Sequence, residues 1–198
     1  MLIATTNAGK IREIRHALTG TPAEFLTLGD FPPIPEPDET GRTFADNALL
    51  KANYYAQSSG VDTVAEDSGL VIDALGGRPG VESARYPGAT YPDKFANLYK
   101  ELAGHPRPWT ARYVCAVACV SPAPAGGPVV LFTVEGRVEG EIAPAPRGSL
   151  GFGYDPIFFY PPYGMTLGET SDEAKLAISH RGAAFRQFAA WVRARRPD

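Results

Sequence analysis

Two adjacent carboxylates form the most informative of four segments that could do chemistry. They belong to Glu66-Asp67-Ser68-Gly69, which follows a run of strand-forming residues. Carboxylates at a strand end, beside a glycine that frees the backbone, can hold a hard cation. Mg²⁺ prefers one or two carboxylates together with waters and substrate phosphates. The alternative is a surface turn, because Asp, Ser and Gly are common turn residues.

A second segment, Thr5-Thr-Asn-Ala-Gly-Lys10, lies between an expected strand and an expected helix. Its small residues let the backbone turn tightly and approach a ligand. N–H groups at a helix start favour anions, and Lys10 adds a positive charge. The segment is not a Walker A loop, because Ile11 stands where that motif needs Ser or Thr. It indicates a phosphate site, with an ordinary strand–helix turn as the alternative.

The third segment, residues 148–155, contains three glycines that alternate with aromatic residues at its end. This pattern suggests a flexible loop that presents Phe152 and Tyr154, and such an aromatic face can stack on a base. Asp155 could accept hydrogen bonds from a base edge. The alternative is a β-bulge whose aromatic side chains belong to the core.

The fourth segment places Lys175, His180 and Arg181 near the start of the last expected helix. Positive charge is otherwise disfavoured at a helix N-terminus, so these donors suggest an anionic or carbonyl-rich ligand. A further acidic cluster occupies residues 36–39, and its default interpretation is a solvated loop.

The elements that must position these segments follow from the spacing of apolar residues. The expected strands are residues 2–5, 63–66, 70–74, 110–120, 129–138 and 157–159, and the expected helices are 10–18, 43–57, 92–102 and 181–195. Thr43 is expected to cap the second helix in a capping box with Asp46. The Pro-rich segments 31–37 and 121–128 are expected to be an extended loop and a hairpin loop. Helices alternating with strands, followed by a long hairpin, predict a mixed α/β fold around a central sheet.

Composition limits the classes of function. The chain has 198 residues, 44% of them hydrophobic, and a net charge of −3, which argues against nucleic-acid binding through bulk electrostatics. Cys115 and Cys119 lie on one face of an expected strand, too far apart for a disulfide, and are expected to be buried free thiols. No apolar run is long enough to span a membrane and no secretory signal is recognisable, so we expect a cytoplasmic protein.

Together these segments resemble the ITP pyrophosphatase family, also called the Ham1-like XTP/dITP diphosphatases. The matching stretches, in the family order, are residues 4–10, 43–52, 66–70, 74–81, 83–86, 151–159, 173–175 and 179–182. Each stretch is a weak signal, but the ordered set is specific. Two departures are small: many bacterial members carry Asp where Glu66 stands, and the family commonly has Gly where Thr6 stands.

The resemblance implies one domain over residues 1–198, with an elongated mixed α/β fold, a central sheet flanked by helices, two lobes with an active-site cleft, and a homodimer. It implies Mg²⁺-dependent hydrolysis of ITP, dITP and XTP to the monophosphate and pyrophosphate, which keeps these nucleotides out of DNA and RNA. Asp67 would be the catalytic carboxylate, and Asp67, Glu39 and Glu66 would place the metal. The residues implied to bind substrate are Thr5, Thr6, Asn7, Ala8, Gly9, Lys10, Lys51, Ser68, Phe152, Gly153, Tyr154, Asp155, Lys175, His180 and Arg181.

A mechanism consistent with these residues has Asp67 orient a water for in-line attack on the α-phosphorus, because positioning and charge stabilisation dominate phosphoryl transfer. A donor from His180 or Arg181 would favour the C6 carbonyl of hypoxanthine or xanthine over the amino group of adenine. One alternative is a pyrophosphatase for other modified bases, like the Maf-like proteins. Another is a nucleotide sensor without catalysis.

Overall fold

The computed structural model describes residues 1–123 and 127–195. The elements in chain order are β1 Leu2–Ile3, α1 Ala8–Ala17, β2 Leu26–Thr27, α2 Phe44–Ser59, β3 Thr63–Ile72, α3 Tyr91–Leu102, β4 Thr110–Ser121, β5 Val129–Ile142, β6 Phe158–Tyr160, β7 Met165–Thr166, α4 Asp172–Ile178 and α5 His180–Ala194. Short 3₁₀ turns connect several of them, among them Asp155–Ile157 just before β6.

Within the described residues, seven strands form one sheet in the order β2-β1-β3-β4-β5-β6-β7. β1 pairs in parallel with β2 and with β3, whereas β6 pairs antiparallel with β5 and with β7. The sheet is therefore mixed, as the sequence predicts. The long strands β4 and β5 are neighbours, which confirms the predicted pairing of the two clearest strands.

The chain forms two compact units, each built from separate stretches of sequence. Unit 1 comprises Met1–Asp67, Cys115–Gly136 and His180–Asp198, and unit 2 comprises Ser68–Val114 and Arg137–Ser179. Three of the boundaries fall inside β3, β4 and β5, so no linker composition marks them in the sequence. The predicted cleft between two lobes stays a prediction.

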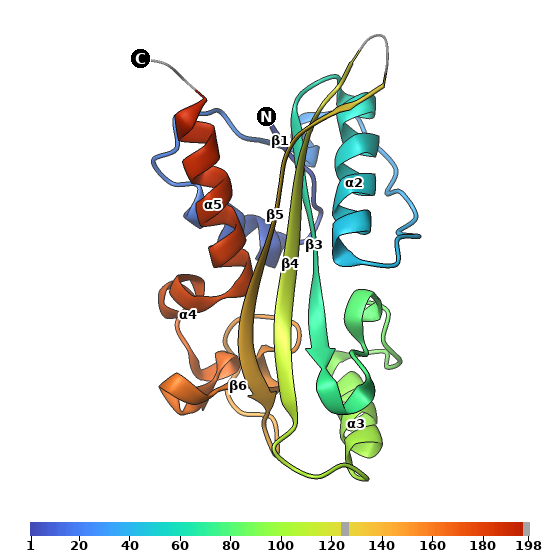
Figure 1. The fold of residues 1–198 in the computed structure, drawn as a ribbon, viewed down its shortest axis with the longest axis vertical. Helices are drawn as coiled ribbons and strands as arrows, with labels where there is room; N and C mark the ends of the chain where they lie inside the picture. The colour runs from blue at the N-terminus through green and yellow to red at the C-terminus, as the bar shows by residue number, and fades with distance from the viewer. Residues whose placement is uncertain (124–126, 196–198) are drawn as a thin grey trace. The chain divides into compact units, whose positions relative to one another are not determined.

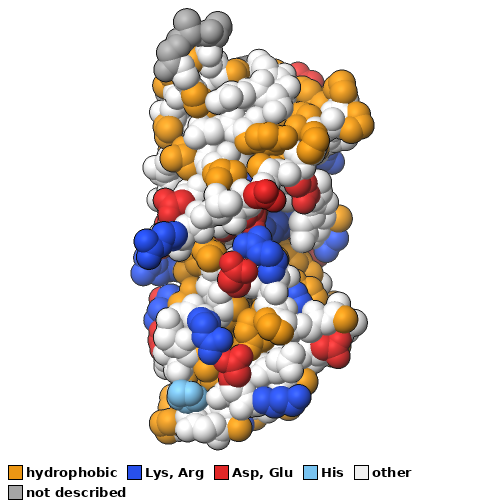
Figure 2. Space-filling model, turned by 90° about the vertical axis from the view of Figure 1, so that its right-hand side faces the viewer, with side chains coloured by type: hydrophobic (Ala, Val, Ile, Leu, Met, Phe, Trp, Pro, Cys, Tyr) orange, Lys and Arg blue, Asp and Glu red, His pale blue; other side chains and the backbone are white. Residues whose placement is uncertain are grey.

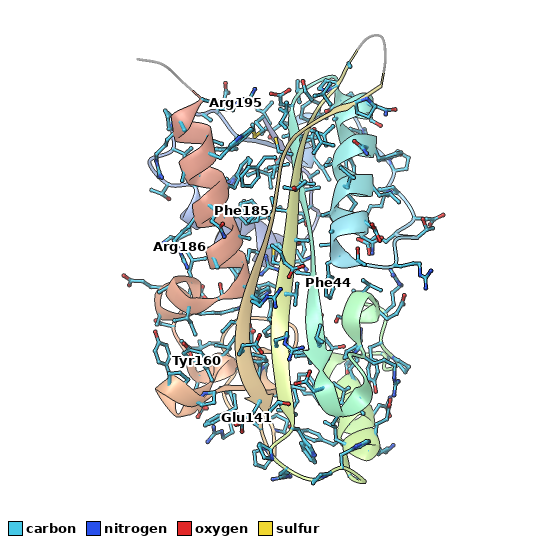
Figure 3. All side chains as sticks on the ribbon, viewed as in Figure 1. Phe44, Glu141, Tyr160, Phe185, Arg186 and Arg195 are labelled. Atoms are coloured by element: carbon cyan, nitrogen blue, oxygen red, sulfur yellow. The ribbon has the colours of Figure 1, made fainter. Side chains whose placement is uncertain are left out.

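Unit 1 has helices on both sides of its strands. α2 covers one side and α5 the other, and α1 packs against α5 (Figure 1). Phe185 points from α5 toward the strands, where it is buried, whereas Arg186 points away from them (Figure 3). The core of this unit is formed by Ile3, Ile14, Leu18, Val64, Cys115, Val117, Cys119, Ala184, Phe185, Phe188, Ala189 and Val192.

Unit 2 has its own core, in which α3 packs with the 3₁₀ turns and the strands of that unit. The core is rich in aromatic side chains and contains Leu70, Ile72, Leu75, Tyr86, Phe95, Leu98, Leu102, Trp109, Ala111, Tyr113, Val138, Ile142, Tyr154, Ile157, Phe158 and Leu167. The α3 helix begins at a capping box in which Thr90 and Asp93 bond to each other's backbone N–H. Both ends of the helix match the sequence prediction within one residue.

The predicted start of α2 is confirmed by its cap. Thr43 accepts a hydrogen bond from the N–H of Asp46, and Asp46 accepts one from the N–H of Thr43, so Asp completes the predicted box at the start of α2. Residues 31–37 contain no helix, as their prolines require. Part of the predicted hairpin loop, residues 124–126, lies outside the described residues.

The sequence prediction of a turn at residues 67–69 is wrong. β3 runs without interruption through Glu66, Asp67, Ser68 and Gly69. Two adjacent buried carboxylates are unfavourable in a strand unless each meets a cation. Lys10 and Arg181 meet Glu66, and Lys51 meets Asp67.

None of the helices in the described residues combines the length and the apolar character that a membrane crossing requires. Acidic and basic side chains are interspersed on the face shown in Figure 2, where neither sign forms a continuous patch. Cys115 and Cys119 are free and buried, as predicted.

Candidate active site

The two adjacent carboxylates of β3 point to opposite faces of the sheet, because successive side chains in a strand alternate. Glu66 meets residues of α1, β4 and α5, whereas Asp67 meets residues of α2. One dipeptide therefore supplies charge to two different environments within unit 1.

On the first face, Glu66 lies in a closed cluster of charges. Its Oε1 is 2.5 Å from Nζ of Lys10, and its Oε2 is 3.5 Å from an Nη of Arg181. The thiol of Cys115 donates to Oε2 at 3.3 Å. Arg181 also donates to Glu13 at 2.5 Å. The buried positive charge of Arg181 is thus balanced by two carboxylates, as buried charge requires.

On the second face, Asp67 lies beside α2. Asn47 donates to its Oδ2 at 3.1 Å, and Lys51 donates to its Oδ1 at 3.3 Å. Lys51 also donates to Glu39 at 2.5 Å, so one ammonium joins two carboxylates. Asn47 and Lys51 are four residues apart on one helix and therefore share a face.

The two carboxylates of β3 have opposite pKa shifts. Burial alone would raise the pKa of Glu66, but the charges of Lys10, Arg181 and Lys51 outweigh it and hold that pKa well below its ordinary value. Burial raises the pKa of Asp67; Lys51 opposes the shift, while the negative charges of Glu39 and Glu66 add to it. Glu66 is thus fixed as an anion, whereas Asp67 is the more basic carboxylate, a property suited to a general base.

The segment from Thr5 to Lys10 forms the loop after β1 and the start of α1, as predicted. Asn7 caps the helix by accepting a hydrogen bond from the N–H of Lys10 at 3.0 Å. Thr6, Asn7 and Ala8 are exposed, and the first turn of α1 contains no acidic residue. An exposed helix N-terminus with Lys10 beside it is suited to bind an anion.

The acidic cluster before α2 matches its default interpretation as a solvated loop only in part, because Glu36 and Asp38 are exposed whereas Glu39 is half-buried. Glu36 accepts a hydrogen bond from the hydroxyl of Thr6 at 2.6 Å, and Glu39 is held by Lys51. Both carboxylates therefore contact residues that the sequence analysis assigns to substrate binding.

The Gly-rich segment of unit 2 forms a loop whose conformation only glycine adopts readily. Gly151 has φ +70°, and a Cβ there would overlap the carboxylate of Asp155. Asp155 accepts a hydrogen bond from the N–H of Phe152 at 2.8 Å and is buried against Lys175, with Nζ 2.5 Å from Oδ2. The same ammonium lies 4.5 Å from the ring centroid of Phe152. Three predicted substrate residues are thus joined in unit 2.

Tyr154 belongs to the core of unit 2. For this residue the alternative prediction, that the aromatic side chains of the loop are core residues, is confirmed. The residue is 3% exposed, its ring meets that of Tyr91 edge-on at a centroid distance of 5.3 Å, and its hydroxyl donates to the carbonyl of Ser83 at 2.7 Å. Phe152 is only half-buried. Of the two aromatic residues, Phe152 is the better placed to stack on a base.

Comparison with known proteins identifies the family. A family model described as the Ham1 family matches residues 1–191. The chain belongs to the Ham1 family. This Ham1 chain is 47% identical over 187 residues to a dITP/XTP pyrophosphatase of Geobacter sulfurreducens, covering 93% of this chain and 92% of that protein. It is 48% identical to a dITP/XTP pyrophosphatase of Geobacillus kaustophilus, with 93% and 89% covered. A solved HAM1 protein from Coxiella burnetii has a TM-score of 0.87 at 36% identity and covers 96% of both chains.

Two residues of the Ham1 chain that hold the site together were not predicted from the sequence. Asn47 is fully buried; besides bonding Asp67, it accepts the N–H of Gly41 at 2.7 Å and so ties the acidic loop to the site. A polar residue on the apolar stripe of a helix is the signal that could have revealed it. Glu13, the partner of Arg181, lies on α1 and gives no such signal.

The donor set of the Ham1 chain fits a magnesium ion on the Asp67 face. In residues 1–123 and 127–195, no three His, Cys, Asp or Glu side chains form a group suited to a metal. Mg²⁺ does not need such a cage, because it binds through one or two carboxylates with waters and substrate phosphates. Glu39 and Asp67, which share one cation, meet that requirement, whereas Glu66 faces the other side of the sheet.

Proposed function

We propose that this chain hydrolyses deaminated purine nucleoside triphosphates, such as ITP, dITP and XTP, to the nucleoside monophosphate and pyrophosphate. The observation that carries the proposal is Asp67, a buried carboxylate with a raised pKa that is held by Asn47 and Lys51 beside Glu39. The names of the relatives, dITP/XTP pyrophosphatase, support the choice of substrates. Such an enzyme would work in the cytoplasm and remove these nucleotides before they enter DNA or RNA.

The phosphates would bind to the cationic groups of unit 1. Backbone N–H groups at the exposed start of α1 and the ammonium groups of Lys10 and Lys51 can offset the charge of a triphosphate and of the leaving pyrophosphate. Lys10 is kept in place by Glu66. Ser68 follows Asp67 in β3 and is assigned to phosphate binding by the family resemblance alone.

Asp67 would orient a water for in-line attack on the α-phosphorus and accept its proton, for which its raised pKa is suited. Asn47 restricts the carboxylate to one orientation. Mg²⁺, held by Glu39 and Asp67, would lower the pKa of a bound water and screen the phosphate charges.

The family resemblance assigns base contact to Phe152, Gly153, Tyr154 and Asp155, with His180 and Arg181. It assigns Lys175 to the phosphates, but the ammonium of Lys175 is buried against Asp155. Phe152 supplies a half-buried aromatic face, and the ion pair between Asp155 and Lys175 fixes the loop that carries it. His180 and Arg181 are both buried, but Arg181 already forms ion pairs with Glu13 and Glu66, so His180 is the better candidate to donate to the C6 carbonyl. His180→Ala should therefore cost more activity with ITP than with ATP; equal losses would refute base reading by His180.

An apolar hollow in unit 2 supports the expected homodimer. The hollow measures about 610 Å³ and lies between α3 and the Gly-rich loop. Tyr91 and Leu150 on its rim are 39% and 50% exposed. Contact with a second copy would cover such a patch. Light scattering should show a dimer that Leu150→Glu weakens, whereas Val130→Glu, at a similarly exposed position in unit 1, should not.

The reaction is tested by mixing the protein with Mg²⁺ and, separately, ITP, XTP, GTP or ATP, and measuring pyrophosphate and free phosphate. Pyrophosphate from ITP and XTP, with little from GTP or ATP, is the expected result. Pyrophosphate from other modified nucleotides only would favour the Maf-like alternative. Nucleotide binding without any product would favour a sensor.

A further inference from the structure

We infer that Lys51 and the divalent metal compete for the same two carboxylates, so that Lys51 keeps the metal site closed until a triphosphate takes over its ammonium group. This inference deepens the proposed function and rests on its assignment of the metal to Glu39 and Asp67. It gives Lys51 a role in the order of binding, in addition to phosphate contact.

The geometry that carries the inference is the position of one ammonium between two carboxylates. Nζ of Lys51 lies 2.5 Å from Oε1 of Glu39 and 3.3 Å from Oδ1 of Asp67. Both oxygens thus lie within reach of one small cation. Magnesium binds oxygens at about 2.0–2.1 Å, so the same two oxygens can hold it after a small movement of the side chains.

The charges make simultaneous occupation unfavourable. Lys51 already offsets one of the two negative charges, and its side chain is only 12% exposed, so water screens it poorly. A divalent ion placed between the same carboxylates would be repelled by the ammonium at close range. The ion can enter only if the ammonium moves away, and the phosphates of a nucleotide are the anions that can receive it.

Lys10 provides a contrast, because it is engaged elsewhere. Its ammonium lies 2.5 Å from Oε1 of Glu66, on the opposite face of β3 from Asp67. Lys10 therefore does not compete for the carboxylates of the metal site. Lys10 can bind phosphate without changing the access of the metal to Glu39 and Asp67.

The test measures binding of Mn²⁺ alone, without nucleotide, to the wild type, Lys51→Met and Lys10→Met. Paramagnetic resonance of the free ion reports the bound fraction directly. Lys51→Met should bind Mn²⁺ at least about tenfold more tightly than the wild type, because a unit charge at this range changes binding by that order or more. Lys10→Met, which removes the same charge on the other face, should differ from the wild type much less.

A second measurement uses the wild type and does not depend on folding of a variant. Amine acylation followed by mass spectrometry reports the accessibility of each lysine. Saturating Mn²⁺ should increase the labelling of Lys51 several-fold relative to Lys10, because the ion displaces its ammonium from Glu39 and Asp67.

The outcomes separate this inference from the proposed function. Three results would overturn the competition while leaving pyrophosphate release by the wild type in place. They are unchanged or weaker Mn²⁺ binding by folded Lys51→Met, equal gains in Mn²⁺ affinity in Lys51→Met and Lys10→Met, and unchanged labelling of Lys51 by the acylating reagent. Loss of Mn²⁺ binding in every protein together with absence of pyrophosphate release would overturn the metal assignment and the proposed function as well.

Discussion

The two faces of β3 at Glu66 and Asp67 differ although they carry the same kind of side chain. Glu66 is enclosed by Lys10, Arg181 and Cys115, and its pKa is held well below its ordinary value. Asp67 meets one ammonium shared with Glu39, and its pKa is raised. The difference shows that charge balance, more than residue type, separates a structural carboxylate from a reactive one.

The largest expected effect concerns the reactive face. Asp67→Asn keeps the size of the side chain but removes its basicity, so kcat for pyrophosphate release should fall by about 10³-fold. Steady-state kinetics with ITP measures the loss, and the melting temperature serves as the control for folding. A kcat within tenfold of the wild type would exclude Asp67 as the general base.

The second effect concerns the enclosed face. Glu66→Gln leaves the buried charges of Lys10 and Arg181 without their shared carboxylate, and breaking a buried pair costs about 3–5 kcal/mol of unfolding free energy. Urea denaturation compares this variant with Asp67→Asn, which should lose less stability. A larger loss of unfolding free energy in Asp67→Asn than in Glu66→Gln would mean that the structural role belongs to Asp67.

A smaller effect is expected where α2 orients the catalytic carboxylate. Asn47→Ala removes the donor to Oδ2 of Asp67, and kcat should fall by about tenfold, the size of one hydrogen bond to a charged group. Asn53 lies on the same helix, but the helical turn places it on a different face from Asn47. The kcat of Asn53→Ala should therefore stay near that of the wild type. Equal losses of kcat in Asn47→Ala and Asn53→Ala would mean that removing any amide side chain from α2 lowers kcat, whether or not that side chain contacts Asp67.

The smallest effect is a difference in acid sensitivity. A lowered pKa makes Glu66 contribute stability above its ordinary pKa of 4.5, and this contribution is lost as the pH falls through the lower folded value. The raised pKa of Asp67 has the opposite sign: its ionised form costs stability, and this cost disappears in acid. Below pH 4.5, unfolding free energy should therefore fall less steeply in Glu66→Gln than in the wild type. As the pH falls through the raised pKa of Asp67 towards its ordinary value of 3.8, unfolding free energy should fall more steeply in Asp67→Asn than in the wild type. Parallel slopes would contradict the opposite shifts.

Much of the fold could be predicted from the sequence because its signals are local. Apolar spacing gives α2, α3 and α5, and the cap residues Thr43 and Thr90 give helix starts. The Gly-Lys segment and the Asp67 carboxylate are recognisable because phosphate and metal chemistry need those residue types close together.

The remaining features depend on contacts between distant residues. The turn expected at residues 67–69 is absent because Lys10, Lys51 and Arg181 balance the carboxylates of an uninterrupted strand. The ion pair of Glu13 with Arg181 joins residues 168 positions apart, and no pattern in the sequence predicts it. The boundaries of the two units fall inside strands, where composition does not change.

The central claim, that the Asp67 face directs water to the α-phosphorus, is tested most directly by hydrolysing ITP in ¹⁸O-labelled water. Mass spectrometry then locates the label in the products. The account predicts one labelled oxygen in inosine monophosphate and none in pyrophosphate. Label in pyrophosphate or in free phosphate would place the attack on another phosphorus and contradict the account.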